Sequence, residues 1–139
     1  MDMRALVVDP GVTGSLRLGM TAEPRPAPGQ LVLDVRHISL NRGEVAFAGH
    51  RPPGTVHGYD AAGVVVRAAA DGTGPAAGTR AAAFGAGAWA QRMTVDTTAV
   101  AEVPAAVELA DAAALPMAGV SALRTLRSRS ILGRRVLVT

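Results

Sequence analysis

Residues 55–66 read TVHGYDAAGVVV, and this segment decides the fold of the chain. Gly58 and Gly63 stand where the backbone needs a positive φ or approaches another segment more closely than a Cβ would allow. The β-branched run at 64–66 that follows predicts a buried strand. The segment therefore predicts a turn that leads directly into the interior of a sheet.

Short strands separated by glycine and proline turns account for most of the remaining chain. Alternating or continuous apolar runs, each bounded by turn residues, predict further strands on both sides of the opening segment. The irregular stretch 41–54 predicts a loop or a short helical turn. The expected strands are 3–8, 16–20, 31–40, 61–69, 80–84, 89–95 and 99–103.

The pattern becomes helical towards the C-terminus. An alanine-rich helix is expected over 108–115, with Pro116 ending it. Ser121 is a plausible N-cap for a second helix over 122–130, in which Leu123 and Leu126 share one face, and Gly133 is a natural residue to follow it. A last strand is expected over 136–138.

Composition limits the class of protein. The chain has 139 residues, 49% of them hydrophobic but only 3% aromatic, which predicts one folded domain with a core of Val, Leu and Ala. The absence of cysteine excludes disulfides and thiolate metal sites and fits a reducing compartment. No signal sequence or membrane span is visible, so we expect a soluble, cytoplasmic protein with no membrane partner.

The net charge of +3 comes from arginine alone, because the chain has no lysine. Five arginines fall within 124–135. No stacking aromatic residues accompany them, so a solvated helix face is expected there and a nucleic-acid partner is not.

Seven segments in order resemble the medium-chain dehydrogenase/reductase family. The resemblance implies a mainly β fold, a GroES-like partly open barrel whose C-terminal helices lead into the first strand of a Rossmann domain missing from the chain. It divides the chain into a GroES-like catalytic domain at 1–120 and the truncated start of a nucleotide-binding domain at 121–139. The seven segments are 3–5, 24–33, 39–44 ("LNxxD"), 78–80, 87–91, 103–116 and 119–123. The opening segment also resembles the family, because 58–65 matches "GxExxGxV" with Asp60 for Glu.

The resemblance also implies which branch of the family applies. Zinc-dependent alcohol dehydrogenases have a Cys where Asn41 stands and a His where Tyr59 stands, and catalytic zinc needs about three protein ligands. A metal site built from His50, His57 and Asp60 lacks supporting spacing, so no metal is expected. The zinc-independent branch reduces quinones, enones or enoyl thioesters with NADPH, which makes NADP the implied cofactor.

Two residues are the catalytic candidates. By resemblance, Asn41 lies beside the nicotinamide and donates its amide to an oxygen that gains charge, although a capping or turn Asn is the structural alternative. Tyr59 is either a proton donor and substrate contact or a residue packed at the barrel mouth. This branch often has a tyrosine five residues after the Asn, but this chain has Ala46 at that position.

Asn41, Ser121 and Met117 are the cofactor-binding candidates. Ser121 would contact the nicotinamide, cap its helix, or both, whereas Met117 would line the cleft or fill the core. Asp60 is expected to anchor loops through backbone N–H groups rather than act as a base, and Glu44 is expected to order its own loop.

The sequence leaves two functions open. The first is the N-terminal part of an NADPH-dependent quinone or enone oxidoreductase, inactive alone because no glycine-rich loop joins a strand to a helix; 72–74 and 85–87 precede strands instead. The second is a stand-alone barrel that acts as an interaction or oligomerisation module. An exposed strand at 136–138 would favour a homodimer or a missing partner segment.

Overall fold

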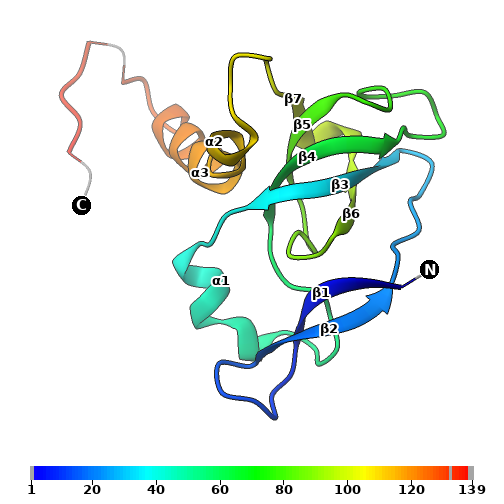
Figure 1. Ribbon diagram of the computed structural model, residues 1–139. Helices are drawn as coiled ribbons and strands as arrows, with labels where there is room; N and C mark the ends of the chain where they lie inside the picture. Colours follow the sequence, from blue (N-terminus) through cyan, green and yellow to red (C-terminus); the bar gives the residue numbers. More distant parts are fainter. Residues whose placement is uncertain (1, 132, 138–139) are drawn as a thin grey trace.

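The computed structural model describes residues 2–131 and 133–137, and the fold is mainly β (Figure 1). Two antiparallel strands, β1 (Asp2–Val8) and β2 (Leu16–Ala22), form a hairpin. Five antiparallel strands form a second sheet in the order β6-β3-β4-β5-β7. These strands are β3 (Gln30–Ile38), β4 (Asp60–Arg67), β5 (Arg80–Phe84), β6 (Arg92–Asp96) and β7 (Val100–Glu102).

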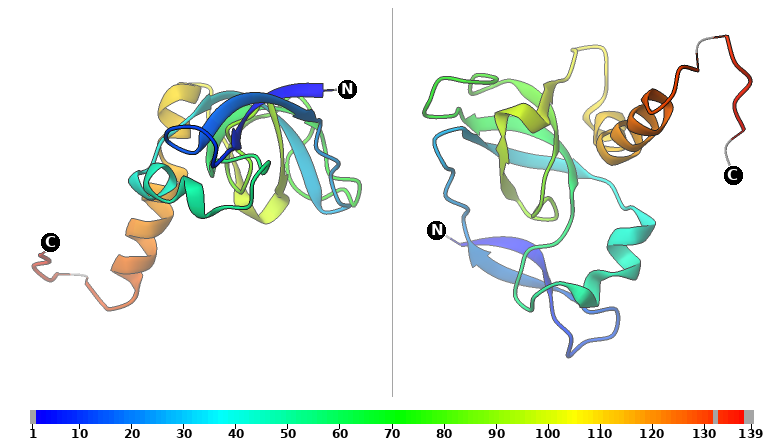
Figure 2. Two further views of the ribbon diagram at one scale, coloured as in Figure 1. Left: turned by 90° about the horizontal axis from the view of Figure 1, so that it is seen from below. Right: turned by 180° about the vertical axis from the view of Figure 1, so that it is seen from behind.

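The sheets curl into a partly open barrel, and the helices lie at one side of it (Figures 1 and 2). A short helix, α1 (Arg42–Ala46), and a 3-10 turn, η1 (Ala48–His50), occupy the stretch expected to be irregular. A second 3-10 turn, η2 (Thr97–Ala99), precedes β7, and α2 (Leu109–Ala113) and α3 (Pro116–Arg127) follow it. The expected barrel-like fold and its seven strands are confirmed. The main difference is that the strand expected over 89–95 begins at Arg92.

Gly58 and Gly63 have the roles that the sequence predicts. Gly58 has a φ of 92°, and a Cβ built on it would lie 2.2 Å from Cδ1 of Trp89. A Cβ on Gly63 would lie 2.0 Å from the carbonyl oxygen of Asp34 on the neighbouring strand β3. The first glycine is needed for both its backbone angle and its lack of a side chain, the second for the close approach of β3 to β4.

The core is built from aliphatic side chains with one indole. Leu31, Leu33, Val65 and Met93 are buried around Trp89, the only tryptophan. Alanines on β4 and β5 leave room for the helices, because Ala62 packs directly against Ala112 and Ala113 of α2. The small side chains thus set how closely α2 approaches the sheet.

The C-terminal helices differ from the expectation. Pro116 does not end a helix but begins α3, because proline lacks an N–H that the first helical position does not need. Ser121 therefore lies in the middle of α3 and is not an N-cap. The helix ends at Arg127, so Gly133, although its φ is 71°, does not follow it directly.

The strand expected over 136–138 is not formed in the part that the structure describes. Val136 and Leu137 are irregular, and Val138 lies outside the described residues. The homodimer was expected because of an exposed terminal strand, so that reason no longer applies. Among the described residues, none of the helices combines the length and apolar character that a bilayer crossing would need.

Candidate functional site

Asp60 is a completely buried carboxylate at the start of β4. Its Oδ2 accepts hydrogen bonds from Ser39 Oγ at 2.8 Å and from Asn41 Nδ2 at 2.9 Å. Its Oδ1 accepts one from the backbone N–H of Met117 at 2.9 Å. Asp60 thus joins the segment after β3 to the first turn of α3, and the expectation that it anchors neighbouring segments is confirmed.

Glu44 is the second buried carboxylate of the site. Its Oε2 accepts from both the backbone N–H and the Nδ2 of Asn41, each at 2.7 Å, and its Oε1 accepts from the backbone N–H of Tyr59 at 2.8 Å. The bond to the Asn41 backbone is one half of a capping box at the start of α1. Glu44 therefore orders its own loop, as expected, and also fixes Tyr59.

Asn41 sits between the two carboxylates. An amide nitrogen carries two hydrogens, and Asn41 Nδ2 directs them to Glu44 Oε2 and Asp60 Oδ2. In this arrangement both donors are engaged, and Asn41 stands at the N-cap of α1. The structural alternative considered for Asn41, a capping residue, is thus present; donation to a substrate oxygen stays a prediction. We call Asp60, Glu44, Asn41, Ser39 and their partners Tyr59 and Met117 the carboxylate network.

Tyr59 is half-buried between an aromatic ring and a cation. Its ring centroid lies 6.1 Å from that of Phe84, and the guanidinium carbon of Arg51 lies 5.1 Å from the Tyr59 centroid. A cation over the face of a phenol ring is attractive. No hydrogen bond to the Tyr59 hydroxyl occurs among the described residues, so the phenol is available as a donor.

The cofactor candidates Met117 and Ser121 lie on α3, one turn apart. Met117 is half-buried, and its backbone belongs to the carboxylate network. Ser121 is exposed, and its carbonyl accepts from Thr125 Oγ1. The structure therefore brings Asn41, Tyr59 and Met117 around two buried carboxylates and leaves Ser121 one turn farther along α3.

The sequence did not predict the contacts that Ser39, His57 and Trp89 make in this region. Ser39 binds Asp60, and its carbonyl accepts from Trp89 Nε1 at 3.0 Å. His57 is buried, lies edge-on to Trp89 at 4.9 Å between ring centroids, and places Nε2 2.8 Å from the carbonyl oxygen of Glu44. A polar residue at the end of an apolar strand, Ser39, was the one sequence signal for this site. No sequence signal indicated that Ser39 pairs with Trp89, fifty positions away.

The residues considered for a metal site do not form a cluster. His50 is exposed against Phe47, whereas His57 is buried and bonded to backbone. Within 2–131 and 133–137, no group of three or more His, Asp or Glu side chains is arranged to hold a metal ion.

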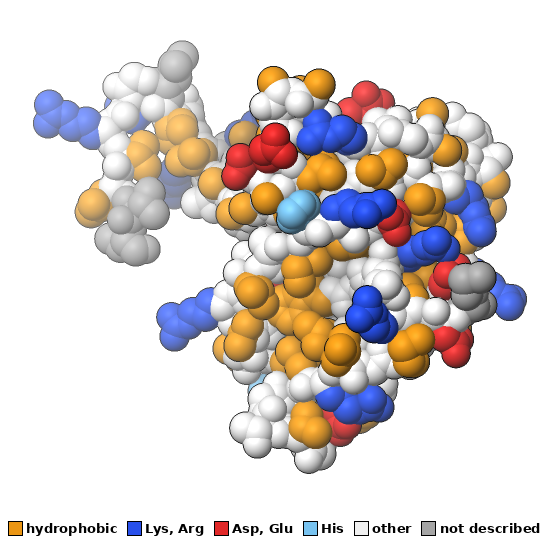
Figure 3. All heavy atoms as spheres, in the orientation of Figure 1, with side chains coloured by type: hydrophobic (Ala, Val, Ile, Leu, Met, Phe, Trp, Pro, Cys, Tyr) orange, Lys and Arg blue, Asp and Glu red, His pale blue; other side chains and the backbone are white. Residues whose placement is uncertain are grey.

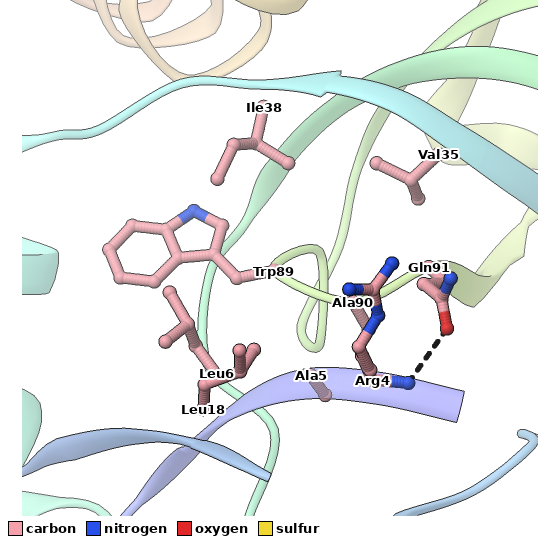
Figure 4. Close-up of a pocket in the computed structure, with 9 residues that line it drawn as sticks. All are labelled: Arg4, Ala5, Leu6, Leu18, Val35, Ile38, Trp89, Ala90 and Gln91. Atoms are coloured by element: carbon pink, nitrogen blue, oxygen red, sulfur yellow. Dashed lines mark hydrogen bonds between the residues drawn. The ribbon is translucent and has the colours of Figure 1, made fainter. Parts of the chain in front are cut away.

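A separate hollow of about 290 Å³ lies between the β1–β2 hairpin and β3. Apolar side chains gather around it on the face shown in Figure 3, and Leu18 is 66% exposed there. Trp89, Ile38 and Leu6 point towards it, with Arg4 and Gln91 at one end (Figure 4). None of the predicted site residues lines this hollow, so the candidate site and this hollow are different places.

Comparisons with known proteins give relatives over most of the chain. No protein-family model matches. The pikromycin polyketide synthase component PikAII of Streptomyces venezuelae is 32% identical over 143 residues, which span 94% of this chain and 4% of that protein. Human synaptic vesicle membrane protein VAT-1 homolog-like protein is 30% identical with a TM-score of 0.84, over 92% of this chain and 44% of its own.

Two further solved structures share the fold. An alcohol dehydrogenase superfamily protein from Novosphingobium aromaticivorans is 27% identical with a TM-score of 0.81, over 92% of this chain and 42% of its own. The quinone oxidoreductase from Coxiella burnetii is 22% identical with a TM-score of 0.83, over 94% and 46%, a likeness of fold alone. The chain spans less than half the length of these solved structures. In its barrel fold and its ordered motifs, the chain matches the GroES-like domain of the medium-chain dehydrogenase/reductase family.

Proposed function

We propose that this chain is the N-terminal, catalytic part of a zinc-independent, NADPH-dependent oxidoreductase that reduces a conjugated carbonyl such as a quinone or an enone. One observation carries the proposal: Asn41, Tyr59 and Met117 come from three separate segments and meet around two buried carboxylates. Buried polar groups held in a fixed geometry are typical of reaction centres. The oxidoreductases that share the fold support the reaction class.

The residues fit only one end of the implied cofactor. Met117 and the exposed Ser121 on α3 are suited to contact a nicotinamide, whereas the glycine-rich segments 72–74 and 85–87 lead into β5 and β6 and not into a helix. A pyrophosphate needs the N–H groups of a helix start that follows such a loop. When bound, NADPH would supply a hydride, and a second half of the protein would hold most of it.

Tyr59 is the first candidate for proton donor. Addition of hydride to a conjugated carbonyl moves an electron pair onto the oxygen, which must then be met by a donor and take up a proton. The Tyr59 hydroxyl has no partner among the described residues, whereas both hydrogens of the Asn41 amide are engaged. Asn41 would have to leave one carboxylate in order to donate, and its main task in this arrangement is to hold the loop.

The absence of a zinc ligand set supports zinc independence. Asn41 and Tyr59 stand where zinc-dependent relatives carry Cys and His, and the chain contains no cysteine. An amide and a phenol are poor substitutes for the thiolate and imidazole that zinc prefers.

A thioester-linked conjugated carbonyl is the second candidate substrate. The observation that favours it is the 32% identity to a polyketide synthase component over nearly the whole chain. Hydride addition and the need for an oxygen-directed donor would be the same for this substrate, so the residues named above keep their roles.

The test starts with the protein made from its own gene in its native cells. An intact mass near twice the 14.1 kDa of this chain is expected, together with NADPH oxidation by a quinone, an enone or an enoyl thioester. In that protein Tyr59→Phe, which keeps the ring, should lower kcat by about 10²-fold and leave NADPH affinity unchanged. A product of 14.1 kDa that oxidises no NADPH would instead favour the stand-alone, non-catalytic barrel.

A further inference from the structure

Helix α3 stands away from the barrel for most of its length. It projects beyond the sheets in the left view of Figure 2, and none of its twelve residues is buried. Three of its four half-buried residues, Pro116, Met117 and Gly119, belong to the first turn. The direction of α3 therefore depends on what holds its N-terminal end.

Asp60 supplies the side-chain hydrogen bond at that end. Met117 is the second residue of α3, and its N–H is one of the first-turn donors for which an α-helix has no internal partner. The Asp60 Oδ1 accepts this donor at 2.9 Å from a completely buried position. A carboxylate at this place also faces the positive end of the helix dipole.

The other oxygen of the same carboxylate reaches the opposite side of the site. Asp60 Oδ2 accepts from Ser39 Oγ and from Asn41 Nδ2, at the N-cap of α1. A hydrogen bond to a charged, buried group contributes more than a neutral one and is costly to leave unmade. One rigid side chain thus connects the starts of two helices that lie more than seventy residues apart in the chain.

We infer that Asp60 is a positioning residue that fixes α3, and with it Met117 and Ser121, relative to Asn41 and Tyr59. The inference rests on the proposed function only for what α3 presents to a cofactor. The physical coupling itself is a property of this chain, and it can be measured without cofactor or substrate.

The first measurement is residue-resolved hydrogen exchange of the unmodified protein. The Met117 amide should exchange about tenfold or more slowly than that of Ala110, which occupies the equivalent position in α2, where the N-cap residue Glu108 makes no side-chain hydrogen bond. Equal exchange at the two amides would overturn the inference. This comparison needs no variant, so it stands even if changes at Asp60 prevent folding.

The second measurement compares two variants. In the isosteric Asp60→Asn, Ser39 and Asn41 compete for the single remaining oxygen, and the amide of the new side chain then faces the Met117 N–H. Exchange across the first turns of α3 should accelerate about tenfold relative to the amides of β3 and β4. Ser39→Ala removes a bond to the same carboxylate without touching α3, and should leave that ratio unchanged.

The ratio separates positioning from general stabilisation. If Asp60 merely stabilised the fold, exchange in α3 and in the central strands would rise together in Asp60→Asn, and the inference would be wrong. If the ratio changes as expected but the natural protein reduces no conjugated carbonyl, the coupling is kept and the proposed function alone fails.

Discussion

Replacing Gly58 by alanine should destabilise the protein more than the same replacement at any other glycine in the turns. Backbone pairing of 57–58 with 87–89 brings the indole of Trp89 across Gly58: Trp89 N–H donates to the His57 carbonyl at 2.8 Å and Gly87 N–H to the Gly58 carbonyl at 2.9 Å. The new Cβ would lie 2.2 Å from Trp89 Cδ1. No atom of the protein can remain at that distance, so the indole or the turn must move.

The expected magnitude has two parts. A non-glycine residue at a φ of 92° costs about 1–2 kcal/mol in backbone conformation. Overpacking of a dense core adds about 1–3 kcal/mol, because the buried Trp89 is also held by its hydrogen bond to the Ser39 carbonyl. The free energy of unfolding should therefore fall by about 2–5 kcal/mol.

Gly54→Ala is the matched control. Gly54 has a φ of 80°, and a Cβ there would meet nothing within 4 Å, so only the conformational cost of about 1–2 kcal/mol applies. Urea unfolding followed by far-ultraviolet circular dichroism gives both free energies. The difference between the two variants isolates the contact with Trp89. If Gly58→Ala costs no more than Gly54→Ala, the close approach of the indole is not the reason for glycine at position 58.

Three further predictions concern the carboxylates and the cofactor. Glu44→Ala leaves three half-buried N–H donors without their acceptor and should lower the free energy of unfolding by about 3 kcal/mol in urea unfolding. Glu102→Ala on the exposed edge strand should change it by less than about 0.5 kcal/mol, and equal effects would contradict the role of Glu44. Hydrogen bonds from the side chain and the backbone N–H of Thr73 hold the pKa of Asp71 below its ordinary value of 3.8. The stability that ionised Asp71 contributes is therefore complete above pH 3.8 and is lost as the pH falls through the lower pKa of the folded state. Thr73→Val should raise the pKa of Asp71 in an NMR titration, and an unchanged pKa would refute this cause. This chain alone should bind NADPH weakly or not at all, and a submicromolar Kd in a fluorescence titration would contradict this expectation.

The sequence by itself determined the local elements. The sequence predicted the positive φ of Gly58 and the close approach of another segment to Gly63. Runs of apolar residues predicted the positions of β1 to β5 to within a few residues. These features depend on neighbours along the chain, where side-chain size and backbone preference act directly. The ordered motifs likewise indicated the resemblance to the medium-chain dehydrogenase/reductase family.

Tertiary structure alone decided the helix ends and the connections of the site. Pro116 is compatible with ending one helix or beginning the next, and the bond from Met117 to Asp60 favours the second. The two hydrogens of the Asn41 amide had several possible partners, and the choice of two buried carboxylates followed from chain segments up to nineteen residues away. Such contacts depend on how distant segments pack, because a buried polar group must find its partner wherever the fold provides one, and the order of residues does not record that place.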